Sequence, residues 1–191
     1  MKEDKKIILV GLGNPGKDYE QSRHNIGFMI LDHLLKKMTA VNDSLWKKSS
    51  KFNSEIAQVN DLIMVKPLSF MNESGKAVSA ILNFYKIPPF GLYVIHDDLD
   101  LPLGKIKISI DRGSAGHKGV QSIISAVGSK NFVRIRVGIG KSAKTPAERF
   151  VLKPFLSAEK GKLKTTIKKA AEAVEMILKE GVEKASSFYN Q

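Results

Sequence analysis

Hydrophobic positions along the 191-residue chain repeat with two periods, one typical of strands and one typical of amphipathic helices. Short apolar runs and strict alternation predict strands, whereas apolar residues three or four positions apart predict helices. Elements of the two kinds alternate along most of the chain. The predicted strands cover 5–10, 54–60, 62–66, 92–95, 105–110 and 133–139, and the predicted helices cover 25–38, 73–86, a segment from about 117 onward, and 157–180.

Turn and capping residues mark the boundaries of several predicted elements. Asn60-Asp61 predicts a hairpin turn between two consecutive strands. Ser157 predicts the N-cap of the last helix, and Gly181 predicts its C-cap. The segments without a regular pattern are the polar, lysine-rich connection 39–52, the loop 141–154, and the polar end 182–191, whose composition is compatible with mobility.

The order of the elements predicts the fold class. Strands that alternate with helices are typical of α/β proteins, in which helices cover both faces of a sheet. The hairpin adds an antiparallel pair, and no internal repeat or linker divides the sequence. We therefore predict one α/β domain over residues 1–191, with a twisted, mixed, mostly parallel sheet and helices on both faces.

The composition narrows the class of partner. Lysine and arginine number 31 against 19 acidic residues, which gives a net charge of +12. This excess favours a polyanionic partner, nucleic acid before an anionic membrane surface, although lysine-rich surfaces also serve solubility alone. The sequence has no cysteine, which excludes disulfides and thiolate chemistry, and no apolar stretch approaches the ~20 residues that span a bilayer. We expect a cytoplasmic protein that does not enter a membrane.

A glycine-rich loop, Gly11–Gly16, follows the first predicted strand. Its G-x-G-x-x-G spacing matches the dinucleotide-binding fingerprint, in which a helix opens at the third glycine. Here residues 17–24 are polar, the apolar period begins only near Ile26, and Asp32 lies inside the predicted helix. The match therefore carries little weight. A polar loop at the carboxyl end of a strand is nevertheless where open α/β sheets bind ligands.

His24 lies in the polar stretch that continues this loop up to the first predicted helix, and it is a candidate general base. Asp97 and Asp98 end another predicted strand, so a His–Asp pair forms at one sheet edge if the two strands are neighbours. A carboxylate fixes the tautomer of a histidine and stabilises its protonated form, which favours base catalysis near neutral pH. The alternatives are a structural histidine and an aspartate that only serves a turn, and either aspartate fits the pair.

The sequence offers no other catalytic apparatus. It contains neither cysteine nor a G-x-S-x-G elbow, and its four histidines lack the spacing of zinc ligands. A histidine without a nucleophile or a metal points to direct activation of water. An ester is a suitable target because its leaving group is better than an amine. We therefore predict a hydrolytic site without metal or cofactor.

Asn14 and Tyr19 lie in the loop after the first predicted strand, and Phe70 and Asn72 lie in the loop 68–72 before the second predicted helix. Asn14 and Asn72 each offer a donor and an acceptor without charge, which suits orientation of a peptide or stabilisation of an oxyanion. The alternatives are a turn role for Asn14 and a helix N-cap for Asn72. Tyr19 and Phe70 are loop aromatics on which a base or sugar could stack, with core packing as the alternative.

A series of short motifs covers nearly the whole chain. They are Gly-Leu-Gly-Asn-Pro-Gly at 11–16, Tyr19 with Arg-His-Asn-Ile-Gly at 23–27, Lys-Pro-Leu-Ser-Phe-Met-Asn-Glu-Ser-Gly at 66–75, His-Asp-Asp-Leu-Asp-Leu-Pro at 96–102, Gly-Ser-Ala-Gly-His-Lys-Gly at 113–119, and Phe-Val-Arg-Ile-Arg-Val-Gly-Ile-Gly at 132–140. In residues and in order, this series resembles the bacterial-type peptidyl-tRNA hydrolases.

The resemblance implies hydrolysis of the ester that joins a peptide to the 3′ ribose of tRNA, which recycles tRNA from prematurely released peptidyl-tRNA. It implies that His24 is the general base and that Asp97, rather than Asp98, supports it. It also implies that Asn14 distinguishes blocked from free aminoacyl groups.

The resemblance further assigns contacts with the substrate. Tyr19, Phe70 and Asn72 are expected to contact the peptide or the tRNA end. The basic surface would hold phosphates of the acceptor stem, with a strong dependence on salt. The residues that we expect to contact those phosphates are Lys107, Arg136 and Lys144.

Lys118 departs from the family pattern, which usually has asparagine after the histidine of the second glycine-rich loop. Lysine cannot accept a hydrogen bond, so its charge would bind a phosphate instead, or would disfavour protonation of His24 if directed there. The departure makes a non-catalytic RNA-binding protein on the same scaffold the alternative to a hydrolase. The retained His24, Asp97 and Asn14 favour the hydrolase, and we expect a monomer without an obligatory protein partner.

Overall fold

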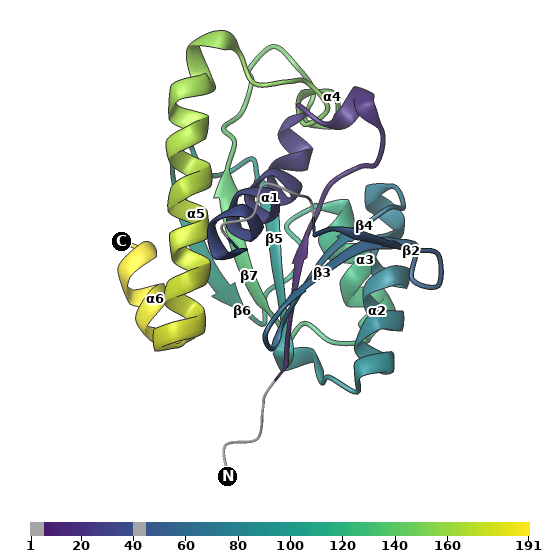
Figure 1. Cartoon of the computed structure of the whole chain (residues 1–191). Coiled ribbons are helices and arrows are strands. Elements are labelled where there is room, and N and C mark those ends of the chain that lie inside the picture. Colours follow the sequence, from purple (N-terminus) through teal and green to yellow (C-terminus); the bar gives the residue numbers. More distant parts are fainter. Residues whose placement is uncertain (1–5, 40–44) are drawn as a thin grey trace.

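A seven-stranded sheet forms the centre of the computed structural model, which describes residues 6–39 and 45–191 (Figure 1). The strand order is β2-β3-β4-β1-β5-β7-β6. The strands are β1 (Ile7–Gly11), β2 (Lys47–Ser49), β3 (Ser54–Val59), β4 (Leu62–Pro67), β5 (Leu92–Asp98), β6 (Ile106–Ile110) and β7 (Val133–Gly138).

The centre of the sheet is parallel and its edges are antiparallel. β1 pairs in parallel with β4 and β5, and β5 pairs in parallel with β7. The hairpin of β3 and β4, the short strand β2 and the edge strand β6 add antiparallel pairs. The predicted mixed sheet with a parallel centre is therefore confirmed.

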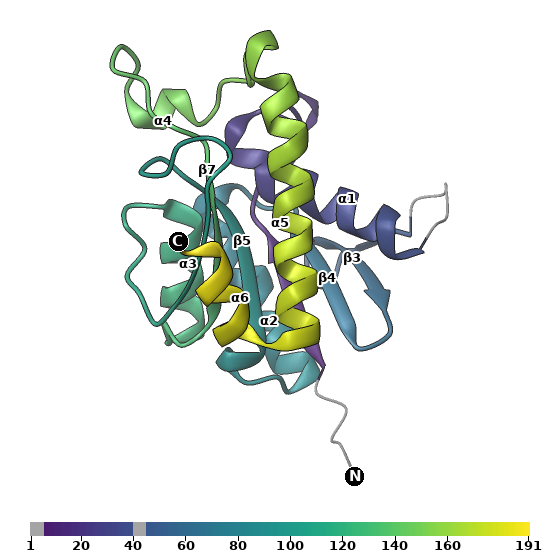
Figure 2. The ribbon, with the colours of Figure 1, turned by 90° about the vertical axis from the view of Figure 1, so that its left-hand side faces the viewer.

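Helices cover both faces of the sheet, as predicted (Figures 1 and 2). One buried cluster joins the sheet to α1, α5 and α6, and a second joins it to α2 and α3. None of the helices in the described part of the chain is long and apolar enough to cross a membrane. The helices are α1 (Ile26–Thr39), α2 (Ser74–Tyr85), α3 (Lys118–Val127), α4 (Ala147–Phe150), α5 (Lys160–Glu180) and α6 (Val182–Tyr189).

The end of the chain differs from its prediction. Residues 182–189 form helix α6, in which Ala185 is fully buried and Tyr189 is 8% exposed. The side chain of Asn190 accepts from the backbone N–H of Ile108 at 2.8 Å and donates to its carbonyl at 2.9 Å. Apolar residues that are sparse in the sequence gather on one side of α6, and this helix docks on β6.

Other elements differ from their predicted boundaries by fewer residues. Ser157 is not an N-cap, because it begins a 3₁₀ turn, Ser157–Glu159, and the Glu159 carboxylate accepts from the backbone N–H of Leu156 at 2.7 Å. Gly181 ends α5 as predicted. β2 and α4 lie in segments for which no element was predicted. Residue 5 of the first predicted strand and residues 40–44 of the predicted connection lie outside the described part of the chain.

Candidate active site

The predicted site residues gather where the parallel strands end. The loop that follows β1 carries Asn14 and His24, and it must return close to the sheet before α1 begins. Gly27 permits this return, because a Cβ there would lie 2.5 Å from the backbone nitrogen of Leu12 and 2.7 Å from the carbonyl oxygen of Ile95. Gly11 of the glycine-rich loop is packed as closely, because a Cβ there would lie 2.5 Å from the carbonyl oxygen of Gly27.

His24 and Asp97 form the predicted pair. The Nδ1 of His24 lies 2.7 Å from Oδ1 of Asp97, and Asp97 is 2% exposed. Because β1 and β5 are neighbours, the loop after β1 meets the last residues of β5. The carboxylate holds the proton on Nδ1 and leaves the Nε2 lone pair of His24 free to accept a proton. Asp98 makes different contacts, with Arg136 and with the backbone of residue 100.

His117 is a second histidine on the same carboxylate, and sequence reasoning did not assign it to the site. Its Nε2 lies 2.9 Å from Oδ1 of Asp97. Its Nδ1 accepts the backbone N–H of Val120 at 3.3 Å and so caps α3. The cap requires an unprotonated Nδ1, so the proton sits on Nε2 and points at Asp97. The only sequence signal was a histidine at the start of a predicted helix after a glycine-rich loop.

The electrostatics of Asp97 favour a permanent carboxylate. Burial raises the pKa of the Asp97 carboxyl, but the hydrogen bonds from His117 and His24, and the attraction of any positive charge on these rings, outweigh it and hold this pKa well below its usual range. An ionised Asp97 can stabilise a positive charge that forms on His24 during proton transfer.

The ring of His96 packs against the ring of His117, with the centroids 4.7 Å apart. It is 3% exposed, and its Nδ1 donates to the carbonyl of Asp97 at 2.7 Å. Its Nε2 is buried and finds no hydrogen-bond partner in the described part of the chain. Burial is the main cause that lowers the pKa of His96 well below the ordinary value for histidine. His96 is therefore neutral near pH 7.

Asn14 is oriented by its neighbours. Its Oδ1 accepts the backbone N–H of Met71 at 2.8 Å. Asn25 clamps the backbone of Asn14 from both sides, accepting its N–H and donating to its carbonyl, each at 2.9 Å. With its side-chain oxygen Oδ1 thus engaged, the amide nitrogen of Asn14 remains as a donor, and Asn14 lines the same pocket as His24. Asn14 is therefore more than a turn residue.

The catalytic pocket has a volume of about 700 Å³ and is lined by Asn14, His24, Asp97 and His117, together with the predicted contact residues. Phe70 is 55% exposed, so it belongs to the pocket rim and not to the core. Tyr19 packs edge-on against it, with ring centroids 6.3 Å apart. Asn72 lies inside a 3₁₀ turn, Met71–Glu73, and does not cap a helix. Both aromatic rings are available to a ligand at the mouth.

Lys118 stands at the mouth of the pocket and pairs with Glu148 of α4. The two charged groups are 2.7 Å apart, and their side chains are 63% and 76% exposed. The hydrogen bond and charge of Lys118 lower the pKa of Glu148. Because Lys118 contacts Glu148, the expected effect of a lysine directed at His24 does not arise.

Arg23 anchors the catalytic loop from behind. It is 3% exposed and forms a two-pronged ion pair with Glu159, at 3.1 and 2.5 Å. Its guanidinium lies 4.4 Å from the ring centroid of Phe150 and 4.7 Å from that of Phe155. The backbone N–H of His24 donates to the carbonyl of Val151, which lies just before Phe155 and Glu159 in the chain, at 2.9 Å. The loop is thus fixed to the chain that precedes α5.

The three residues expected to contact phosphates lie apart from His24. Arg136 is bonded to Asp98 through its Nε at 2.7 Å, and Lys107 lies opposite Arg136 in the register of β6 and β7. Lys144 is exposed in the loop after β7. None of these three lines the catalytic pocket. They remain candidates for contact with the body of a nucleic acid.

The catalytic cluster also has the composition of a metal site. One ligand atom from each of His24, Asp97 and His117 lies within 4.8 Å of the others. Histidine spacing in the sequence gave no sign of this, because the fold brings together residues that are distant in the chain. In the arrangement described above both imidazoles direct N–H groups at the carboxylate, so a metal would have to displace two protons. The expectation that the site works without metal or cofactor stays a prediction.

Comparison with known proteins supplies independent information. Residues 8–191 match a protein-family model described as peptidyl-tRNA hydrolase. The peptidyl-tRNA hydrolase of Thermodesulfovibrio yellowstonii is 45% identical over 188 residues, which cover 97% of this chain and 99% of that protein. That of Carboxydothermus hydrogenoformans is 44% identical over 185 residues, covering 97% and 98%. The crystal structure of the Acinetobacter baumannii peptidyl-tRNA hydrolase has a TM-score of 0.84 at 30% identity, covering 98% of this chain and 95% of that one.

Proposed function

The chain belongs to the peptidyl-tRNA hydrolase family, and we propose that His24 is the general base with which it hydrolyses the ester between a peptide and the 3′ end of tRNA. The observation that carries this proposal is the bond between His24 and Asp97, which leaves Nε2 of His24 unprotonated at a pocket of about 700 Å³. General base catalysis by a positioned histidine contributes typically ~10²–10⁴-fold to a rate.

The proposed reaction is a direct attack of water. Nε2 of His24 takes a proton from the water as its oxygen bonds to the ester carbonyl carbon. Asp97 stabilises the imidazolium that forms, while His117 holds the carboxylate in place. When the bond to the ribose oxygen breaks, the imidazolium returns the proton to that leaving oxygen. The products are a peptide with a free carboxylate and a tRNA with a free 3′ hydroxyl, and no covalent enzyme intermediate forms.

Asn14 is suited to select substrates with a blocked amine. Its amide nitrogen is the group left free, since Met71 occupies its oxygen. A peptide or an acetylated amine offers a carbonyl oxygen that can accept this hydrogen bond. A free aminoacyl ester offers only an ammonium group, whose protons would face another donor. Aminoacyl-tRNA is therefore expected to be a poor substrate.

The remaining predicted residues receive roles in binding. Tyr19, Phe70 and Asn72 line the pocket and would contact the terminal nucleotide and the peptide. The tRNA acceptor stem would lie on the basic surface, where affinity should fall steeply with salt. The enzyme is proposed to act as a cytoplasmic monomer, without cofactor or protein partner. The expected phosphate contacts are Lys107, Arg136 and Lys144.

A non-catalytic RNA-binding protein is the second candidate, and Lys118 is the residue that favours it. Two observations count against it. Lys118 is paired with Glu148, so its charge is partly compensated away from the base. The buried contacts of Asp97 with two histidines would also have no purpose in a protein that only binds.

The deciding experiment compares an N-acetylaminoacyl-tRNA with the same aminoacyl-tRNA bearing a free amine, in single-turnover release. Rapid release from the blocked form alone is the expected result. Absence of release from either, together with salt-sensitive tRNA binding, would establish the RNA-binding alternative. In that case Lys118→Asn would be the first variant to test for recovery of activity.

A further inference from the structure

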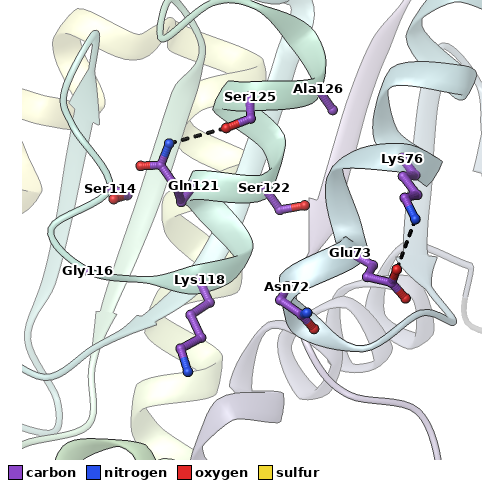
Figure 3. A pocket seen from close by; sticks show the side chains of 10 residues that line it. All are labelled: Asn72, Glu73, Lys76, Ser114, Gly116, Lys118, Gln121, Ser122, Ser125 and Ala126. Carbon is purple, nitrogen blue, oxygen red and sulfur yellow. Dashed lines mark hydrogen bonds and ion pairs between the residues drawn. The ribbon is translucent and has the colours of Figure 1, made fainter.

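A second cavity adjoins the catalytic pocket on the side of α2 and α3 (Figure 3). Its volume is about 610 Å³. Asn72, Ser114, Gly116 and Lys118 line both cavities, so the two share a wall. The residues that line only the second cavity are Glu73, Lys76, Gln121, Ser122, Ser125 and Ala126.

The cavity lies where α2 and α3 are in close contact. The backbone N–H of Gly75 donates to the hydroxyl of Ser122 at 2.9 Å. A Cβ on Gly75 would lie only 2.1 Å from the carbonyl oxygen of Ser122, so this approach of the two helices requires glycine. The start of α2 is thereby fixed against the middle of α3, and the cavity between the two helices is a built part of the fold.

The two cavities differ in chemistry. The catalytic pocket has the aromatic rings of Tyr19 and Phe70, on which a base can stack. No aromatic residue is among those that line the second cavity, which instead offers hydroxyls, amides and charged groups (Figure 3). Without a ring to stack on, a nucleobase has less to gain here, whereas hydroxyls and amides match the donors and acceptors of a peptide main chain.

From this contrast we propose that the second cavity is a peptide subsite, which holds the residues N-terminal to the esterified one. The proposal rests on the proposed hydrolase function. Asn72 is the link between the two cavities, because it lines both and its exposed amide makes no hydrogen bond to any other described residue. A peptide whose ester carbonyl lies at His24 would pass Asn72 and continue along α3.

The charges around the subsite favour acidic peptide side chains. Lys76 and Lys118 flank the cavity, and each is held by a surface glutamate, Glu73 at 2.9 Å and Glu148 at 2.7 Å. Exposed ion pairs of this kind are weak, so a carboxylate of the substrate can exchange for one of these partners. We expect a glutamate as second residue to be preferred over a lysine by about two- to five-fold at low salt.

Peptide length provides the test. The substrates are one tRNA that carries either a single acetylated residue or an acetylated tripeptide with the same esterified residue. Ser125 is exposed in the cavity, so Ser125→Trp should fill it. Lys130 is exposed outside both cavities, so Lys130→Trp is the matched control. We expect Ser125→Trp to lower kcat/KM about ten-fold for the tripeptide, which is about 1.4 kcal/mol, and to leave the single-residue substrate unchanged.

The results distinguish a peptide from tRNA as the ligand of the second cavity. Equal losses for both substrates would place the tRNA in this cavity and overturn the proposal, and no loss for either would overturn it as well. Lys76→Glu gives a second measurement with little steric change, and it should reverse the preference between glutamate and lysine at the second residue. If the unmodified enzyme fails to release even the single acetylated residue, the proposed function itself is wrong.

Discussion

Two charged contacts beside the catalytic pocket differ in almost every physical respect. Asp97 is 2% exposed, and one of its oxygens accepts from two histidines. Lys118 and Glu148 meet across the pocket mouth with more than half of each side chain in water. A buried carboxylate depends on every partner that it has, whereas an exposed pair is screened by water and ions. A departure from the family pattern is therefore tolerable at Lys118 but not at the residues around Asp97.

The largest effect is expected at His24, the proposed base that contacts the buried Asp97. For His24→Ala we expect a loss of ~10²–10⁴-fold in single-turnover release, because no other group in the proposal can take the proton of water. Affinity for tRNA should stay within a few-fold of the unmodified enzyme. An unfolded circular dichroism spectrum in this variant would instead assign His24 a structural role.

The ion pair behind the catalytic loop tests whether burial controls the cost of breaking a charge pair. Arg23→Gln leaves Glu159 without its two-pronged partner and removes a guanidinium packed on two rings. Breaking a buried pair in this way costs about 3–5 kcal/mol in unfolding free energy, to be measured with urea. Glu159 is 27% exposed, which places the expectation at the lower end of that range. A loss no larger than that of an exposed pair would refute the distinction.

His117 serves both the cap of α3 and Asp97, and two substitutions separate these roles. His117→Ala should lower the free energy of unfolding by about 1 kcal/mol through loss of the cap, while His117→Asn should retain most of it. In both variants Asp97 loses a donor and should hold the protonated His24 more strongly. We therefore expect the acid limb of the pH–rate profile to move to higher pH. An unmoved limb would limit His117 to its capping role.

His96 predicts a pH dependence of stability. Its pKa is lowered in the fold, so below about pH 6.5 the unfolded chain binds a proton that the folded chain does not. Stability should decrease as the pH falls below that value, with a slope of at most about 1.4 kcal/mol per pH unit for one proton. The lowered pKa of Asp97 acts in the same direction below about pH 4. Urea unfolding of His96→Gln, compared with the unmodified chain from pH 7 to 5, should show a smaller slope.

The exposed pair should give the smallest effect. For Glu148→Gln we expect no measurable change in the urea midpoint, and a change in kcat/KM below about five-fold, as is usual for exposed ion pairs. Lys118→Asn, which restores the usual family residue, should behave similarly. A change of two orders of magnitude in either variant would show that the pair closes the pocket during catalysis.

The hydrophobic pattern of the sequence predicted most helices and strands correctly, but it failed at a short helix and at a helix boundary. The strong apolar periods of α2 and β7 were visible in the sequence, and so was the hairpin turn between β3 and β4. Helix α6 was missed because its few apolar residues form no clear period in the sequence, and they stabilise the helix only by packing against β6. Ser157 was misassigned as an N-cap because it lies inside the 3₁₀ turn, whose capping position is Leu156, and the Glu159 carboxylate accepts the backbone N–H of that leucine.

Within the site, the sequence by itself nominated residues that the structure places around one pocket. A histidine in a loop after a strand, aspartates at the end of another strand, and asparagines in nearby loops were all visible, and the resemblance selected Asp97 over Asp98. Residue type and local position carry that information because acid–base and hydrogen-bonding capacity belong to the side chain itself.

Only the tertiary structure decided which groups meet. The parallel pairing of β1 with β5 brings His24 to Asp97, the start of α3 adds His117 to the same oxygen, and Met71 turns the amide of Asn14. The direction of Lys118 toward Glu148, and the second cavity beside it, are likewise products of packing. These contacts join residues far apart in the chain, so no local pattern encodes them. They exist because burial of two hydrophobic faces fixes the order of the strands and, with it, the loops at their ends.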